Sequence, residues 1–266
     1  MTRLAGAHVL ITGASRGIGK HLAYELAARG ARLTLVARDG AALGAVATET
    51  GGRYVTADFA DDDTYTDLVE SVERRGGPLD VLINNAGAVH AESMLRQSSV
   101  DLRRAVEVNL LAPMELTRQA ISQMSRRGCG HIVNVGSIGA VAVFPGLVPY
   151  AAAKAGLAHF SAGLRVDLRG RGIKVTHVDV GPVMTDALQS AKSHGPADAS
   201  YRRAYRLRLL VDLNPDLVAR QIVTAIEQDR RVVRLPRRTA PLGLLVELPR
   251  RAVEALLVGI PRTAGT

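Results

Sequence analysis

The sequence predicts an α/β fold with a doubly wound parallel sheet in three layers, α/β/α. Short apolar runs alternate along the chain with segments of helical periodicity, a pattern typical of a parallel sheet covered by helices on both faces. The chain has 266 residues, of which 47% are apolar, enough for one α/β domain with a large core. We therefore expect a single domain at residues 1–238 and an amphipathic C-terminal tail at residues 239–266.

The expected elements follow one another in β–α order. Expected strands cover residues 8–11, 32–37, 53–57, 79–83, 131–135, 173–180 and 231–235. Expected helices cover residues 18–27, an alanine-rich segment ending at 48, and residues 61–75, 98–127, 150–168 and 215–228. Residues 182–210 are polar and less regular, and we expect them to cross the carboxyl edge of the sheet, where doubly wound folds bind ligands.

A glycine-rich turn, Thr-Gly-Ala-Ser-Arg-Gly-Ile-Gly at residues 12–19, joins the first strand to the first helix. Glycines let backbone N–H groups approach a phosphate closely, and the N-terminus of the following helix adds partial positive charge. The turn therefore predicts a pyrophosphate site, although a tight strand-to-helix connection also accounts for some turns of this kind when the turn is considered alone.

Charge and cysteine content limit the partners. The net charge is +9, but residues 201–266 hold 13 Arg and 6 Asp or Glu, so the basic surplus is local. Aromatic residues make up 3% of the chain and Trp is absent, which argues against a nucleic-acid partner. Cys129 is the only cysteine, which excludes an internal disulfide and a Cys-based metal site. We expect no metal and, without a signal-peptide pattern, a cytoplasmic location.

The tail differs in composition from the domain. Residues 240–260 are mostly Leu, Val and Ala, interrupted by charged residues and prolines, so no part reaches the roughly 20 apolar residues that span a bilayer. An amphipathic helix starting at Pro249 would suit peripheral contact with the inner membrane face, a second subunit or the tail's own domain. These three alternatives stay open.

Three polar side chains form a candidate catalytic group. Tyr150 and Lys154 are spaced i, i+4, so they share one helix face, and Ser137 follows a strand at the carboxyl edge. A nearby ammonium stabilises a phenolate and lowers the tyrosine pKa toward the working range. A serine hydroxyl can hold a substrate oxygen. Each residue alone is also compatible with an ordinary structural role.

Together these motifs resemble the short-chain dehydrogenase/reductase family. The matching pieces are the glycine turn at 12–19, Asp58, Asn-Asn-Ala-Gly at 84–87, Asn109, Ser137 and Tyr-Ala-Ala-Ala-Lys at 150–154. The resemblance covers about residues 5–235. It implies a Rossmann-type fold, hydride transfer between a nicotinamide cofactor and a carbonyl or alcohol, and a homodimer or homotetramer formed through the long helices at 98–127 and 150–168.

The resemblance also implies a role for each matching residue. Tyr150 would be the general acid in reduction and the base in oxidation, Lys154 would lower its pKa and hold the nicotinamide ribose, and Ser137 would position the substrate oxygen. Asn109 would hold a water in the proton relay. The cofactor would contact Gly13, Ser15, Arg16, Gly17, Ile18, Gly19, Arg38, Asp58, Phe59, Asn85, Ala86, Gly87, Tyr150, Lys154, Gly181, Val183 and Thr185. Val180 stands where the family usually has proline, which puts the local loop shape in doubt.

Cofactor choice follows from charge. Where the family places an acidic residue for the ribose hydroxyls of NAD, this chain has Ala37 followed by Arg38, and Arg16 lies inside the glycine turn. Two guanidinium groups suit a 2′-phosphate, since the arginine fork matches phosphate. We therefore predict NADP(H). Asp39 could instead turn inward and pair with Arg38, so an NAD(H)-dependent alcohol dehydrogenase stays open.

An apolar substrate is indicated by apolar residues near the predicted site. They are Ile138, Ala140, Val141, Val143, Phe144, Leu188 and residues 207–211, and they favour a hydrophobic ketone or secondary alcohol. A catalytically silent dinucleotide sensor or scaffold, and a protein acting mainly at a lipid surface, remain alternatives. We expect His90, Met94 and His177 to have structural or surface roles.

Overall fold

The computed structural model describes residues 1–142 and 144–236. Seven parallel strands form one sheet in the order β3-β2-β1-β4-β5-β6-β7. The strands are β1 (His8–Thr12), β2 (Arg32–Ala37), β3 (Arg53–Thr56), β4 (Val81–Asn84), β5 (Gly130–Val135), β6 (Ile173–Val180) and β7 (Val232–Leu235). The predicted doubly wound sheet is confirmed. The proposed domain boundary at 238 and the tail lie outside the described residues.

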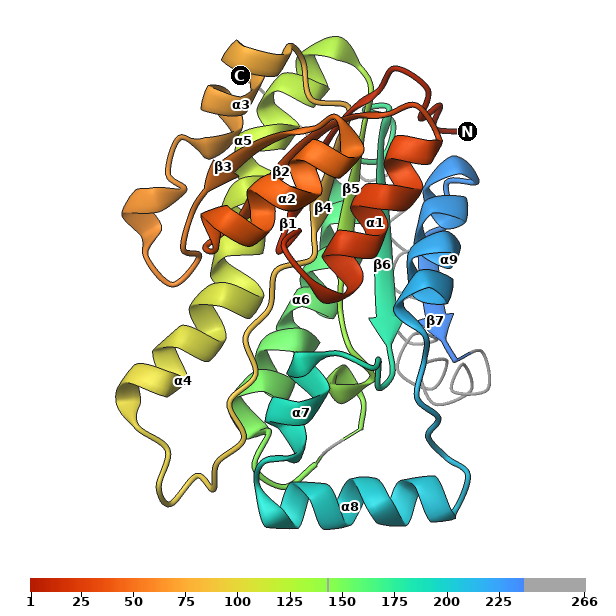
Figure 1. Cartoon of the computed structure of the whole chain (residues 1–266). Helices are drawn as coiled ribbons and strands as arrows, with labels where there is room; N and C mark the ends of the chain where they lie inside the picture. The colour runs from red at the N-terminus through yellow and green to blue at the C-terminus, as the bar shows by residue number, and fades with distance from the viewer. Residues whose placement is uncertain (143, 237–266) are drawn as a thin grey trace.

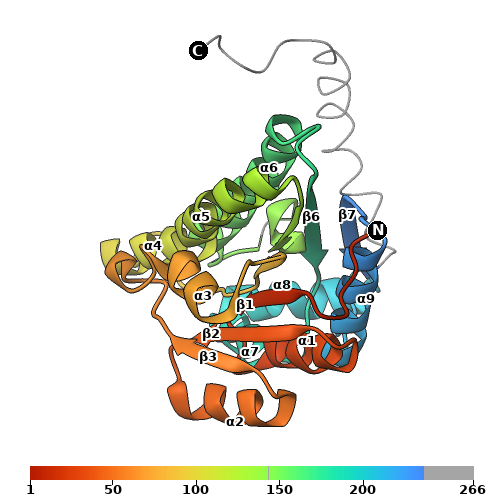
Figure 2. The same cartoon turned by 90° about the horizontal axis from the view of Figure 1, so that it is seen from above.

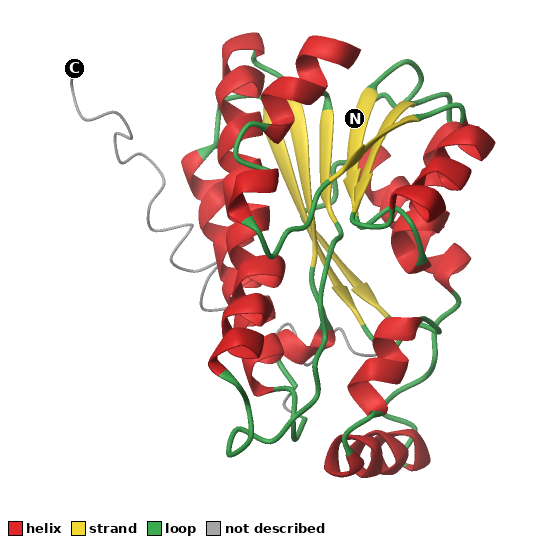
Figure 3. Ribbon diagram, turned by 60° about the vertical axis from the view of Figure 1, so that its left-hand side comes forward, coloured by secondary structure: helices red, strands yellow, loops and turns green. Residues whose placement is uncertain are grey.

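Helices cover both faces of this sheet, as Figures 1 and 2 show. One layer contains α1 (Gly17–Ala28), α2 (Gly40–Thr50) and α9 (Pro215–Glu227). The other contains α3 (Leu68–Gly76), α4 (Ser99–Val106), α5 (Ala112–Arg127) and α6 (Val148–Asp167). Figure 3 shows the strands enclosed between these red helical layers. None of the described helices is long and apolar enough to cross a membrane.

Each layer has its own apolar core. Leu22 and Leu26 of α1 and Ile222 of α9 pack with strand residues such as Val9 and Ile11 on one face. The opposite face buries the second set of strand residues against the other helices, including Leu10, Leu82, Ile132, Val72, Leu116 and Met124. Burial on both faces explains why the strands are continuously apolar and not alternating.

The strand order reverses between β1 and β4, and β4 is the central strand of the sheet. Ligands of such sheets bind at this reversal, beyond the carboxyl ends of the strands. Two further helices, α7 (Asp186–Lys192) and α8 (Gly195–Arg206), lie beyond that edge, where the arrows of β6 and β7 point in Figure 1. We call α7 and α8 the lid helices.

Residues 182–210 cross the carboxyl edge as expected, but most of this segment is helical and not irregular. Ala197 and Tyr201 are spaced i, i+4 and are buried, while the arginines of α8 cover its solvent face. Pro196 stands at the start of α8, where a missing backbone N–H costs little. The polar composition therefore reflects the outer face of a helix.

Two other predicted helices have different limits in the structure. The helix expected from residue 61 begins at Leu68, and a short 3₁₀ helix, Asp62–Thr64, precedes it. The hydroxyl of Thr64 donates to Asp58 O at 2.8 Å. The long segment at 98–127 is α4 and α5 joined by a π-helical turn, Glu107–Leu111. Such turns widen a helix locally and are frequent at functional sites.

Candidate active site

A cavity of about 850 Å³ opens at the carboxyl edge, between the sheet and the lid helices. This volume is within the range of small-molecule sites. Of the predicted site residues, the following line the cavity: Gly13, Ser15, Arg16, Gly17, Ile18, Arg38, Asp58, Phe59, Asn85, Ala86, Gly87, Ser137, Tyr150, Lys154, Gly181, Val183 and Thr185. The structure thus brings together nearly all of them from the ends of six strands, β1 to β6, and from α6. Gly19 and Asn109 lie behind the cavity wall.

Two glycines of the turn, Gly13 and Gly19, stand where a side chain would clash with neighbouring backbone. A Cβ on Gly13 would lie 2.8 Å from Ala86 Cα, and one on Gly19 would lie 2.1 Å from Gly13 O. Gly13 and Gly17 also have positive φ values, +68° and +54°, which favour glycine. Gly19 therefore serves the packing of α1 against the turn and not the cavity surface.

The Asn-Asn-Ala-Gly segment supports this turn. The side-chain amide of Asn85 donates to Thr12 O at 2.9 Å and to Gly13 O at 3.2 Å. The hydroxyl oxygen of Thr12 accepts from the backbone N–H groups of Asn85 and Ala86, both at 3.0 Å. The end of β4 thereby holds the end of β1 in place across the point where the strand order reverses.

The candidate catalytic residues meet where β5 ends. Ser137 Oγ accepts from Gly139 N at 3.1 Å and faces the hydroxyl of Tyr150, which stands in the first turn of α6. Lys154, one turn further along α6, is buried, and its Nζ donates to Val135 O at 3.0 Å. A side chain on Gly87 would approach Lys154 Nζ to 3.7 Å. Three elements therefore converge on one corner of the cavity.

Burial controls the ionisation of this group. Burial raises the pKa of Tyr150, and the hydrogen bond with Ser137 partly opposes that rise. Burial also lowers the pKa of Lys154 to about 8. Lys154 Nζ lies 5.9 Å from the Tyr150 ring centroid. Ser137 favours the phenolate here, and the expectation that Lys154 lowers the Tyr150 pKa stays a prediction.

The chain matches a known protein family over most of its length. The profile of the short chain dehydrogenase family matches residues 7–195. The chain belongs to the short-chain dehydrogenase/reductase family. Members are oxidoreductases that use a nicotinamide dinucleotide and act on small molecules. The resemblance noted in the sequence is therefore confirmed.

Three similar proteins illustrate the match. An uncharacterized short-chain type dehydrogenase/reductase from Sinorhizobium fredii is 35% identical over 223 residues, covering 82% of this chain and 84% of that protein. A 3-oxoacyl-[acyl-carrier-protein] reductase from Salmonella typhimurium is 33% identical, covering 68% and 75% respectively. The solved structure of a bulky-bulky ketone specific alcohol dehydrogenase from Comamonas testosteroni has a TM-score of 0.77 at 26% identity, covering 98% and 97%.

Asn109 of this short-chain dehydrogenase lies in the π-helical turn and is fully buried. Its side-chain amide donates to Ala88 O at 2.8 Å and to Ala105 O at 2.9 Å, and its Oδ1 accepts from Ala88 N at 3.3 Å. The side chain therefore joins the π-helical turn to the segment after β4. A role in holding a relay water stays a prediction.

The two arginines predicted to bind a 2′-phosphate occupy different settings. Arg38 follows β2, and its guanidinium lies 3.7 Å from the Asp58 carboxylate. Arg16 instead forms a 2.8 Å ion pair with Asp186 at the start of α7. Asp39 accepts from Ala42 N at 3.0 Å and caps α2. Asp39 therefore has a structural role of its own at the start of that helix.

The segment after β6 is held by backbone and side-chain hydrogen bonds. β6 continues through Val180, which pairs with Leu235, and Gly181 N donates to Leu235 O at 2.7 Å. Thr185 Oγ1 donates to Val183 O at 3.2 Å. Gly181, Val183 and Thr185 all line the cavity, so the valine at position 180 leaves this predicted arrangement intact.

An apolar compartment lies under the lid helices. Phe144 stacks on Tyr201 with ring centroids 4.7 Å apart, and Ile138, Leu147 and Leu188 line the same side of the cavity. Tyr201 was not predicted, although the i, i+4 spacing of Ala197 and Tyr201 would have indicated it. The apolar lining expected from residues 207–211 is wrong, because none of them lines the cavity, and Leu207 and Leu209 are each 59% exposed. Val143 lies outside the described residues.

The remaining histidine and cysteine positions give no further reactive group. His90 and Met94 are exposed at the surface, and His177 is buried. Cys129 is exposed. Within residues 1–142 and 144–236, no three His, Cys, Asp or Glu side chains gather as metal ligands would. Association into dimers or tetramers and the contacts of the tail stay predictions.

Proposed function

We propose that this short-chain dehydrogenase interconverts an apolar ketone and a secondary alcohol by NADP(H)-dependent hydride transfer. The observation that carries the proposal is that Ser137, Tyr150 and Lys154 line the same cavity as the glycine turn. A nucleotide held at the turn and a carbonyl held at Tyr150 would meet inside one enclosed volume, as hydride transfer requires.

The glycine turn fits the pyrophosphate of a dinucleotide. Gly13 and Gly17 line the cavity and have no side chain there, which leaves their backbone open to it. The first turn of α1 contains no acidic residue, and the side chain of its N-cap, Arg16, makes no capping hydrogen bond. The first N–H groups of α1 are therefore left for an anion, whose negative charge the helix dipole favours.

The catalytic residues would act on the substrate oxygen. When bound, the nicotinamide supplies or accepts the hydride at the carbonyl carbon. Tyr150 would donate its phenolic proton to the oxygen during reduction and take it back during oxidation. Ser137 Oγ accepts from Gly139 N, and its hydroxyl, which faces Tyr150, would turn to donate its hydrogen to that oxygen. Lys154 would hold the nicotinamide ribose beside them.

The preference for NADP(H) rests mainly on Arg38. Its 3.7 Å contact with Asp58 is loose, and both side chains are about half exposed, so a 2′-phosphate would replace a weak ion pair. The Arg16 guanidinium is already paired with Asp186, so it would have to leave that carboxylate to bind the 2′-phosphate or bind both groups at once. Arg38 is therefore the residue on which cofactor choice should depend most.

The Arg38→Ala substitution tests this preference. We expect kcat/KM with NADPH to fall about 10- to 100-fold, since a charged hydrogen bond contributes about 1.5–3 kcal/mol, while kcat/KM with NADH changes little. Arg32→Ala is the matched control, because Arg32 stands at the opposite end of β2 and donates to Gly6 O and Gly76 O. Equal losses with both nucleotides, or a wild-type preference for NADH, would favour the NAD(H)-dependent alternative.

A bulky apolar substrate is supported by the compartment that Phe144, Tyr201 and Leu188 enclose. The names of two similar proteins point the same way, since one reduces 3-oxoacyl groups and the other is specific for bulky ketones. We therefore place the substrate's apolar group under the lid helices and its carbonyl at Tyr150.

A panel of carbonyl compounds tests the proposed function directly. Wild-type protein and NADPH are mixed with ketones graded from small to bulky and with 3-oxoacyl thioesters, and NADPH absorbance is followed. We expect turnover to increase with apolar bulk. No turnover with any compound, combined with measurable nucleotide binding, would favour the catalytically silent sensor.

A further inference from the structure

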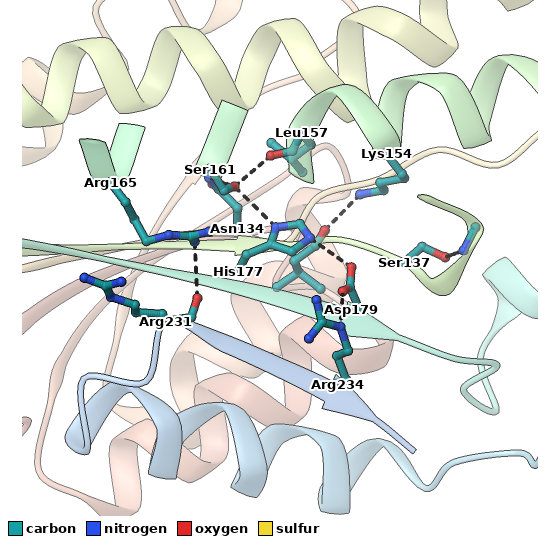
Figure 4. A network of polar contacts seen from close by, with 12 residues as sticks. Asn134, Ser137, Lys154, Leu157, Ser161, Arg165, His177, Asp179, Arg231 and Arg234 are labelled. Carbon is teal, nitrogen blue, oxygen red and sulfur yellow. Dashed lines mark hydrogen bonds and ion pairs between the residues drawn. The ribbon is translucent and has the colours of Figure 1, made fainter. Parts of the chain in front are cut away.

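We call the part of the cavity where Ser137, Tyr150 and Lys154 meet the catalytic corner. A chain of buried polar groups lies behind it, next to Lys154 and the end of β5 (Figure 4). At its centre is His177 of β6, which is 4% exposed. Its Nε2 lies 2.9 Å from Asp179 Oδ1, and its Nδ1 lies 3.3 Å from Ser161 Oγ. Buried polar groups cost free energy unless they are paired, so this arrangement needs a physical explanation.

Asp179 and Arg234 balance the charge of this group. Asp179 is 9% exposed, and its Oδ2 lies 3.2 Å from Arg234 Nε on β7. A buried ion pair seldom stabilises a fold more than apolar side chains would, but breaking one partner is costly. Stability alone therefore gives a weak reason for an ion pair in this place, whereas a need for fixed geometry gives a stronger one.

The ring of His177 occupies the space beside Gly136. A Cβ on Gly136 would lie 2.6 Å from His177 Cε1 and 3.1 Å from Val178 O. The two neighbours of Gly136 both belong to the catalytic corner, because Val135 O accepts from Lys154 Nζ and Ser137 faces Tyr150. The position of the ring therefore limits where this end of β5 can lie.

The same ring is connected to α6, which carries Tyr150 and Lys154. Ser161 stands about two helical turns after Lys154, and its hydroxyl donates to Leu157 O at 2.7 Å. Ser161 Oγ also accepts from Asn134 Nδ2 of β5 at 2.9 Å. Ser161 thus links β5, β6 and α6 at one buried point.

We propose that His177, held by Asp179 and Arg234, is a positioning residue that sets the distance between Ser137 at the end of β5 and the Tyr150 and Lys154 side chains of α6. The inference rests on the proposed function for its catalytic consequence. His177 does not line the cavity, so it acts through Gly136 and Ser161 and not on the substrate. Its ring contacts both β5, at Gly136, and α6, at Ser161, and these are the two elements whose distance must stay fixed.

Loss of this arrangement should weaken the contact between Ser137 and Tyr150. The His177→Phe substitution keeps a ring beside Gly136 but removes both hydrogen bonds of the imidazole. The Ser137 hydrogen bond lowers the Tyr150 pKa. If the end of β5 becomes mobile and this hydrogen bond weakens, the Tyr150 pKa should therefore rise. The other ionisable groups around this corner are Lys154 of α6, Tyr201 of α8, and Asp179 and Arg234 behind the strands, and the substitution leaves all four in place.

The test measures the Tyr150 titration and the turnover of the full chain. Because the chain has no Trp and 6 Tyr, tyrosinate absorbance can be followed directly, and subtraction of the same variant carrying Tyr150→Phe isolates Tyr150. We expect His177→Phe to raise the Tyr150 pKa and to lower kcat about 10- to 100-fold, as small misplacements of catalytic groups do, with KM for NADPH unchanged. The His177→Gln side chain can still donate to Asp179, so this variant should have a Tyr150 pKa and a kcat close to those of the wild type.

His131 supplies a matched control. It is fully buried on β5, and its ring bonds to Thr2 Oγ1 at 2.9 Å and Thr176 Oγ1 at 2.8 Å, at the opposite end of the strands. His131→Phe should lower the melting temperature and leave the Tyr150 titration and kcat unchanged. Asp179→Asn is a second variant, expected to act like His177→Phe with a smaller change in volume.

The outcomes separate the two proposals. If His177→Phe and Asp179→Asn lower only the melting temperature, as His131→Phe does, the positioning role is wrong. If the wild-type protein turns over no carbonyl compound, the proposed function fails, and the Tyr150 titration still decides the positioning role.

Discussion

Replacing Tyr150 by phenylalanine should lower kcat for carbonyl reduction by about 10²- to 10⁴-fold, the usual contribution of general acid catalysis. The substitution removes the one phenolic proton that the cavity presents beside Ser137, but leaves a ring of the same size in the first turn of α6. The bound nucleotide would still reach the carbonyl carbon, but the developing oxyanion would find no acid. KM for NADPH should therefore change little.

The measurement compares steady-state kcat with nucleotide affinity from NADPH fluorescence in the same preparation. Tyr54→Phe is the matched control, because Tyr54 lies on β3 with 49% of its surface exposed and outside the cavity lining. Its kcat should equal that of the wild type. Unchanged turnover in the Tyr150→Phe variant on a good substrate would show that another group protonates the oxygen.

The strands and the cavity at the carboxyl edge of the sheet could be predicted from the sequence because both depend on local patterns. Strands buried on both faces are continuous apolar runs, and glycine at positions 13 and 17 is required by positive φ values. In a parallel sheet all strands end at one edge, so Ser137 and the segment at 84–87 had to lie near the glycine turn. Sequence order and topology together were sufficient.

The lid helices and the partners of Arg16 could not be predicted in the same way. The ion pair between Arg16 and Asp186 joins residues 170 positions apart, and no local periodicity encodes such a pair. Tyr201 was missed because its one signal, the i, i+4 spacing with Ala197, is a short apolar pattern among the arginines of α8. Exposure of Leu207 and Leu209 depends on where α8 ends, and helix ends are the least predictable part of a sequence pattern.

The electrostatic balance at the catalytic corner was the least predictable feature. The i, i+4 spacing places Lys154 near Tyr150, but it says nothing about how much water each side chain keeps. In the structure burial dominates both groups and shifts their pKa values in opposite directions. His177 likewise gives no signal in the sequence, since its relation to Gly136 depends on the register of β5 and β6.

Replacing Lys154 by methionine should abolish most turnover and at the same time stabilise the nucleotide-free protein near neutral pH. Lys154 is 4% exposed, and burial lowers the pKa of its ammonium to about 8, against about 10.4 in an unfolded chain. Between these values the unfolded chain binds more protons than the native one, so the wild-type free energy of unfolding rises with pH. Below pH 8 the full cost of the buried charge, about 3 kcal/mol at most, is present.

Methionine has no charge to bury, so the Lys154→Met variant should exceed the wild type in unfolding free energy near pH 7 and lose that advantage as the pH approaches about 10. Part of the gain is offset, because Val135 O loses its donor, at a cost of about 1–3 kcal/mol that does not vary with pH. Urea unfolding at several pH values measures the difference, with Lys174→Met, an exposed residue of the same sheet, as the control whose difference should stay flat. A flat difference for Lys154→Met as well would mean that the lysine keeps its ordinary pKa and would remove burial as the factor that tunes this site.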